Sequence, residues 1–156
     1  MDLKQHLVDT FHFNDQANRK LIQKFGELPD PAEAIRLFSH LINCQFKWMA
    51  RVRQDPKLSE LDWWEPLYEI GHMEGKWMDS LKLWLDYLNA VAEDELLKEV
   101  HFPGFDGSPY AATPADIMLQ LNYHSIHHRG QIQAIIRRQG ITPDFLDYIG
   151  TRYRKL

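Results

Sequence analysis

The most informative segment of this sequence is Asn122-Tyr123-His124-Ser125-Ile126-His127-His128-Arg129-Gly130-Gln131, which places three imidazoles within five positions. Residues three or four apart share one face of an α-helix, so His124 can converge with either His127 or His128. The apolar stripe through this segment, in steps of three or four, consists of Ile117, Leu121, His124, His128, Ile132 and Ile135. His127 falls on a flank of that stripe. The pattern therefore predicts two inward-facing histidines, with His127 at the surface or hydrogen-bonded beside them.

Histidines at two positions of a buried stripe need polar partners. A buried polar group without a partner costs about 1 to 3 kcal/mol by mutational estimates. A metal ion is one partner that would satisfy both imidazoles. We therefore treat His124 and His128 as candidate metal ligands, each of which still needs a further ligand from elsewhere in the chain.

The chain as a whole has the length and composition of one globular domain, which we expect to span residues 1–156. The formal net charge of −4 argues against direct nucleic-acid binding, which usually requires a basic surplus. The single cysteine, Cys44, excludes an internal disulfide and fits a reducing compartment. The N-terminus lacks the layout of a secretion signal, and no run approaches the roughly 18 apolar residues of a membrane span. We expect a cytoplasmic protein that binds neither nucleic acid nor membrane.

Four amphipathic segments predict the helices, because apolar residues recur in each at helical spacing. Two of them begin at strong start signals, Asp30-Pro31 and Thr113-Pro114. Residues 98–112 contain an alternating run and turn signals, which predict a small hairpin or loop. With connectors of modest length, the pattern predicts an all-α, antiparallel, up-and-down four-helix bundle. The approximate helix bounds are 2–25, 31–53, 67–90 and 114–139.

Residues outside the histidine segment supply further candidates. Asn14 lies on the apolar stripe of the first helix and could point into a pocket, although a hydrogen bond between helices is the favoured interpretation. The adjacent Trp63 and Trp64 could wall a ligand pocket, although a plug at the end of the core is the favoured interpretation. Glu74 could act as a general base near the histidines, although a boundary position with its carboxylate in water is favoured. Periodicity alone places His40 at the surface or boundary of the second helix.

Taken together, these stretches resemble the DinB family, the DinB/YfiT-like metalloenzymes of bacteria. The matching residues are Phe13-Asn14, Ala17-Asn18-Arg19, Ser39-His40-Leu41, Asn122 to Gln131, Arg137, Gly140, Pro143 and Asp147. The resemblance implies an up-and-down four-helix bundle, often dimeric, in which three histidines hold a divalent metal ion. Carried over to this sequence, the implied ligands are His40, His124 and His128.

The resemblance also implies a function. Three protein nitrogens leave at least one coordination position open, as in catalytic metal sites, and characterised relatives include transferases that use low-molecular-weight thiols and a thiol-dependent isomerase. We therefore expect a homodimeric, metal-dependent transferase that combines such a thiol with a small-molecule substrate. The candidates to orient the ligands or anchor the substrate are Tyr123, His127, Arg129 and Glu74. The candidates to contact the thiol cofactor are Trp63, Trp64 and Asn14.

Two other functions stay open. A metal-dependent hydrolase would use a bound water in place of the thiol. A non-catalytic stress-response protein would use the metal only to tie its helices together, with Cys44 as a possible fourth ligand, although a buried apolar role for Cys44 is favoured. The sequence does not identify the metal, because imidazole ligands suit zinc, nickel, iron or copper.

Overall fold

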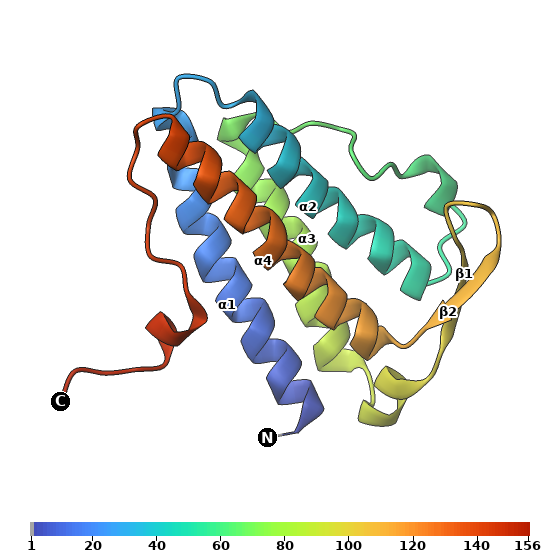
Figure 1. Ribbon diagram of the computed structural model, residues 1–156. Coiled ribbons are helices and arrows are strands. Elements are labelled where there is room, and N and C mark those ends of the chain that lie inside the picture. Colours follow the sequence, from blue (N-terminus) through green and yellow to red (C-terminus); the bar gives the residue numbers. More distant parts are fainter. Residues whose placement is uncertain (1) are drawn as a thin grey trace.

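The computed structural model describes residues 2–156, which form four long helices and one two-stranded sheet (Figure 1). The helices are α1 (Leu3–Gln23), α2 (Ala32–Val52), α3 (Ile70–Ala90) and α4 (Pro114–Arg138), and the strands are β1 (Val100–Pro103) and β2 (Pro109–Ala112). Short 3-10 turns cover Phe25–Glu27, Leu58–Glu60, Glu93–Leu97 and Tyr148–Thr151. The four helices and the hairpin before the last one are therefore confirmed. Within residues 2–156, no helix has the length and hydropathy needed to span a membrane.

The start of α4 follows the local chemistry that the sequence predicts. The Thr113 hydroxyl accepts a hydrogen bond from the backbone N–H of Asp116 at 3.1 Å, and Pro114 occupies the first helical position. At α2, the Asp30 carboxylate accepts from the backbone N–H of Ala32 at 3.2 Å. The Thr113 contact caps α4, whereas α2 has Pro31 at its cap position and no side-chain hydrogen bond there.

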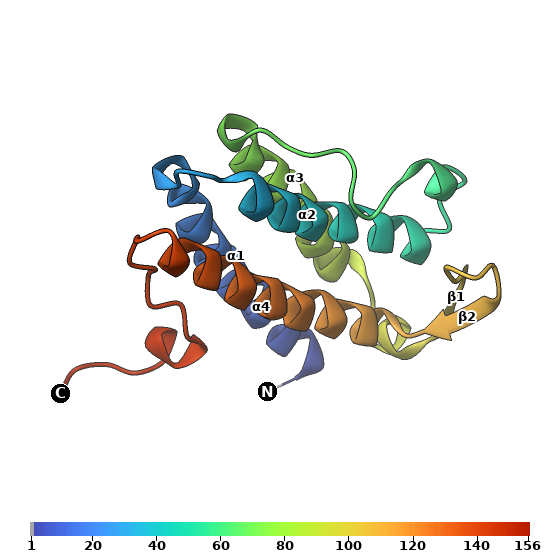
Figure 2. The same cartoon turned by 45° about the horizontal axis from the view of Figure 1, so that its top comes forward.

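The four helices form two layers, with α2 and α3 in one layer and α1 and α4 in the other (Figure 2). Helices within a layer run parallel. In the first layer, Phe38 packs on Trp77 at 5.7 Å between ring centroids. About two turns further along both helices, the Gln45 backbone carbonyl accepts from the Trp84 indole N–H at 3.2 Å. Helices in facing layers run antiparallel, as the ring contact between Phe11 and Trp84 and the hydrogen bond between Asp15 and Trp77 indicate for α1 and α3.

The predicted up-and-down order is therefore wrong, because consecutive helices α2 and α3 point the same way (Figure 1). The cause is the connector 53–69, which runs back along α2. Lys47 donates to the Leu61 carbonyl at 2.5 Å, and the Tyr68 backbone N–H reaches the Ser39 hydroxyl at 3.0 Å. The 21 residues of α2 span about 30 Å at a rise of about 1.5 Å per residue, a distance that an extended connector of this length covers.

The hairpin pairs β1 with β2 in antiparallel register, from Val100 opposite Ala112 to Pro103 opposite Pro109. It lies beside the C-terminal end of α2, where the Gln54 side chain donates to the His101 carbonyl at 2.8 Å. The hairpin and the connector together cover the face of α2 that no helix covers.

The buried apolar residues divide into two clusters. One contains Phe25, Phe38, Met73, Trp77, Ile132 and Ile136, and the other contains Leu7, Phe11, Trp84, Leu88, Ile117 and Leu121. In α4 the change from one cluster to the other falls at residues 122–131, the polar segment with the histidines. The histidine segment therefore crosses the middle of the bundle between two apolar regions.

Candidate metal centre

Three imidazoles meet where α2 and α4 face each other. His40 projects from α2, and His124 and His128 project from α4. Their ring centroids are 5.0 Å apart for His40 and His124, 5.1 Å for His40 and His128, and 4.4 Å for His124 and His128. The structure thus brings together all three residues that the sequence and the resemblance predicted as ligands. Their role in holding a metal stays a prediction.

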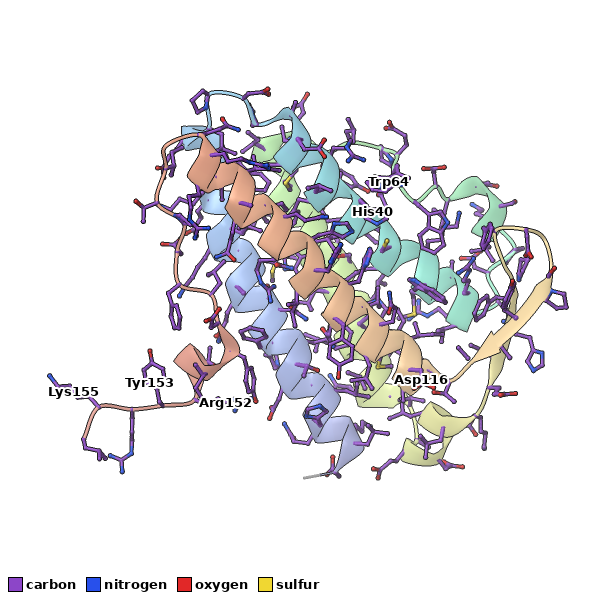
Figure 3. All side chains as sticks on the ribbon, viewed as in Figure 1. His40, Trp64, Asp116, Arg152, Tyr153 and Lys155 are labelled. Atoms are coloured by element: carbon purple, nitrogen blue, oxygen red, sulfur yellow. The ribbon has the colours of Figure 1, made fainter. Side chains whose placement is uncertain are left out.

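The burial of His40 corrects the prediction from periodicity. Its side chain is buried, with 7% of the residue exposed. The connector 53–69 covers it: the imidazole stacks on the Trp64 ring at 3.9 Å between centroids, and the two side chains lie together in Figure 3. A helical wheel detects faces that other helices bury, so it could not detect a face that a connector buries.

Hydrogen bonds to carbonyl oxygens fix the protonation of two rings. The Nδ1–H of His40 donates to the Trp63 backbone carbonyl at 2.7 Å, and the Nδ1–H of His128 donates to the Gln131 side-chain carbonyl at 2.7 Å. Neutral rings held in this way carry their lone pair on Nε2, and such partners typically orient histidines that ligate metals. Sequence reasoning did not single out Gln131, although its position three residues after His128 on the same helix was available as a signal.

The Nε2 atoms of His40 and His124 face each other. The Nε2 of His40 lies 2.9 Å from the Nε2 of His124, so without a metal the His124 ring donates the proton that they share. Burial lowers the pKa of His40 and of His128. Burial, followed by the charges of the neighbouring imidazoles, lowers the pKa of His124 to about 4. All three rings are therefore neutral at pH 7, which is the form that binds a metal ion.

The lowered pKa of His124 predicts how the metal-free protein responds to acid. The unfolded chain takes up a proton at this residue near pH 6.5, whereas the folded chain does so only near pH 4. Between these values the unfolded state binds more protons, so the free energy of unfolding falls as the pH is lowered from about 6.5 to about 4. Urea denaturation at a series of pH values with a chelator present measures this slope. His124→Gln should flatten the slope, and an unchanged slope in that variant would contradict the assignment.

Cys44 lies one turn after His40 and adds a fourth candidate ligand. Its Sγ is 3.5 Å from the His40 Nε2, and burial raises the pKa of the thiol to about 12. Within residues 2–156, His40, Cys44 and His124 each offer one ligand atom, all within 4.8 Å of one another, so this cluster could hold a metal ion. The cluster shares two members with the predicted set and has Cys44 in place of His128.

The residues proposed to assist the ligands lie in different places. Tyr123 and His127 are exposed on α4, and the His127 ring lies 5.0 Å from the His128 ring. Glu74 is half-buried on α3, with a carboxylate oxygen 4.0 Å from a guanidinium nitrogen of Arg19. Only His127 of these three is in ring contact with the histidine cluster.

Arg129 and Asn14 belong to a buried polar network that joins α1 to α4. The Arg129 guanidinium donates to the amide oxygens of Asn14 and Asn18, at 3.0 and 2.8 Å. The amide nitrogen of Asn18 donates in turn to the Ser125 hydroxyl at 2.8 Å, and that of Asn14 reaches the side-chain oxygen of Asn122 at 2.5 Å. Burial lowers the pKa of Arg129 to about 10, so the group stays charged at neutral pH. For Asn14, the structure has the interhelical hydrogen bonds that the sequence favoured.

The paired tryptophans of the connector line two cavities beside the histidines. A cavity of about 150 Å³ is lined by His40, Cys44, Trp48, Trp63, Gln120, Leu121 and His124. A second cavity, of about 380 Å³, adjoins His128. Its lining includes Trp64, Arg36, Gln131 and Arg138. Both indoles line cavities, and Trp63 also packs against one of the two apolar clusters, so the structure has features of both interpretations, and a ligand in either cavity stays a prediction.

The chain is therefore a four-helix-bundle protein with a candidate metal centre. Neutral histidines from two facing helices form that centre, and a cysteine lies beside them. Within that class the chain belongs to the DinB superfamily, whose family model matches residues 25–132. The matched range contains His40, Cys44, His124 and His128. Neither a curated protein nor a solved structure matches the chain.

Proposed function

We propose that the chain is a metal-dependent transferase that joins a low-molecular-weight thiol to a small-molecule substrate, with His40, His124 and His128 as ligands. The observation that carries this proposal is the convergence of three neutral imidazoles whose protons at Nδ1, in His40 and His128, are held by carbonyl oxygens. A zinc, nickel or iron ion held there would lower the pKa of a thiol or a water molecule and so make a nucleophile available at neutral pH.

The residues around the site favour a bound low-molecular-weight thiol, and not the Cys44 thiol of the chain, as the nucleophile. Cys44 keeps its proton on Sγ, because burial raises its pKa to about 12. Trp64 stacks on the His40 ring and Trp63 lines the cavity beside it, so the two indoles narrow the approach to the rings. His127, exposed beside the His128 ring, is placed to pass a proton between the site and solvent.

The proposal predicts thiol-dependent activity that needs the histidines. The purified chain, loaded separately with zinc, nickel and iron, is offered small thiols together with an aryl halide, and the loss of thiol and release of halide are measured. Activity should require both metal and thiol, fall to background in His124→Ala, and be kept in His72→Ala, whose histidine is exposed. Activity on esters or amides without a thiol would favour the hydrolase instead.

A non-catalytic role is the second candidate, and the position of Cys44 favours it. The Cys44 Sγ lies only 3.5 Å from the His40 Nε2, and a metal ion that displaced its proton would gain a further ligand and have a purely structural task. The homodimer and the cytoplasmic location are also part of the proposal and rest on the family resemblance and composition. Light scattering that gave the mass of a single chain would remove the homodimer from it.

A further inference from the structure

A charged group, Arg51, is buried near the C-terminal end of α2, away from His40. His40, Cys44, Trp48 and Arg51 follow one another in steps of three or four, so they lie along one face. Arg51 is buried, with 7% of the residue exposed, and lies eleven residues or about 16 Å along the axis from His40. The hairpin and the connector cover this part of the helix.

Three aromatic rings enclose the Arg51 guanidinium. Its central carbon lies 4.6 Å from the ring centroid of Trp48, 4.9 Å from that of Trp63 and 4.7 Å from that of Phe102. Cation–π attraction of this kind stabilises a cation that has lost its water. The rings, however, supply no hydrogen-bond acceptors to the N–H groups at the edge of the guanidinium.

The polar atoms of Arg51 are only partly satisfied. Nη2 donates to the Pro103 carbonyl at 3.1 Å, whereas the buried Nε has no partner. Lys47 lies one turn earlier, with its ammonium 4.8 Å from the centroid of the same Trp63 ring. Among residues 2–156, no carboxylate forms an ion pair with either cation, and Asp62 acts on Lys47 only at longer range. Two neighbouring buried or half-buried cations without an anion are costly to keep in a folded protein.

A cavity opens beside Arg51, and Lys47 is joined to it through the Trp63 ring that both cations contact. The cavity has a volume of about 350 Å³ and is lined by Arg51, Trp63, Phe102, Gly104, Phe105 and Tyr110. Phe105, at the tip of the hairpin, is 96% exposed, so nearly all of its ring is open to solvent. Trp63 also lines the cavity of about 150 Å³ that contains His40 and His124. One indole therefore separates the histidine site from the cationic site.

We propose that Arg51 and Lys47 bind a carboxylate at the far end of the small molecule that reacts at the histidines. The guanidinium edge and the ammonium supply the charge that a planar carboxylate needs, and Trp63 and Phe102 pack against the carbon chain between the two ends. The link to a reacting molecule rests on the proposed function, whereas the anion site does not. If Arg51 served only to pin the hairpin to α2, through its contact with Pro103, anions would not bind here saturably.

The test is a titration of the full chain with succinate and, separately, with inorganic phosphate, at constant ionic strength. Two-dimensional NMR follows the indole N–H signals, of which those of Trp48 and Trp63 report on the site and that of Trp77 reports on the core. With succinate the first two should shift and saturate, and the Trp77 signal should stay still. Arg51→Met and Lys47→Met should each weaken binding by about tenfold or more. Lys76→Met, which removes an exposed lysine paired with Asp79, should leave it unchanged.

Each other outcome would overturn the inference. Absence of a saturable shift, wild-type affinity in both variants, or a response to phosphate alone would each refute carboxylate binding at this site. If Arg51→Met loosens the hairpin, the loss of binding in that variant could be indirect. Lys47→Met then tests the anion site without removing the contact between Arg51 and Pro103. Repeating the titration in His124→Ala separates the two proposals: succinate binding that persists there supports the anion site even if the metal-dependent activity fails.

Discussion

His124→Ala is expected to carry almost no metal after purification without chelator, whereas the wild-type chain carries close to one divalent ion. His124 belongs to both ligand sets that the structure allows, since its Nε2 faces the Nε2 of His40 at 2.9 Å. Loss of a hydrogen-bond partner outside the ligands already costs about 10- to 100-fold in metal affinity, so loss of a ligand should cost more. Elemental analysis by mass spectrometry measures the ratio of metal to protein. His72→Ala, at an exposed histidine, should keep the wild-type ratio.

Two further variants decide which third residue binds. If His128 is the third ligand, His128→Ala should lose the metal and Cys44→Ser should keep it. If Cys44 is the third ligand, the two results should be exchanged, and the site would resemble a structural one more closely. Near-zero metal in both the wild type and His128→Ala would contradict the metal proposal as a whole.

The sequence was sufficient for the helices but not for their order. Apolar spacing depends on burial within each helix, so it located the four helices to within a few residues. The direction of α3 depends on where the connector 53–69 lies, and single hydrogen bonds such as that from Tyr68 to Ser39 hold it there. Such a contact leaves no periodic trace in the sequence. We expected the connector 53–69 to be of modest length and to join antiparallel helices. It instead runs back along α2, so the predicted up-and-down order was wrong.

In the candidate site too, periodicity predicted the residues that other helices bury and missed those that a connector or hairpin buries. His124 and His128 were found from the stripe alone, because α1 and α2 bury that face of α4. His40 was recovered only through the family resemblance, since a connector rather than a helix covers it. Arg51 had no signal at all, because its aromatic partners come from α2, the connector and the hairpin. Residues assembled from three separate segments cannot be read from one periodic pattern.

The largest effect on stability is expected from Arg129→Met. This change removes the only donor to the amide oxygens of Asn14 and Asn18 found in the structure, and leaves both buried between α1 and α4. A buried acceptor without a partner costs about 1 to 3 kcal/mol, so the two together should lower the free energy of unfolding by about 2 to 6 kcal/mol. Urea denaturation measures the change. Arg138→Met, at an exposed position in the last turn of the same helix, should change it by no more than about 0.5 kcal/mol.

The same variant separates a structural role of Arg129 from a role at the metal. The guanidinium hydrogen-bonds to α1, and no hydrogen bond joins it to the three histidines in the part of the chain that the structure describes. Arg129→Met, where it stays folded at low temperature, should therefore bind metal with the wild-type ratio. Asn18→Ala is the second test variant, because it removes the hydrogen bond between Asn18 on α1 and Arg129 on α4 without changing any charge. It should also bind metal with the wild-type ratio. Loss of metal from Arg129→Met at unchanged stability would contradict the structural role and return Arg129 to the list of groups that act on the ligands.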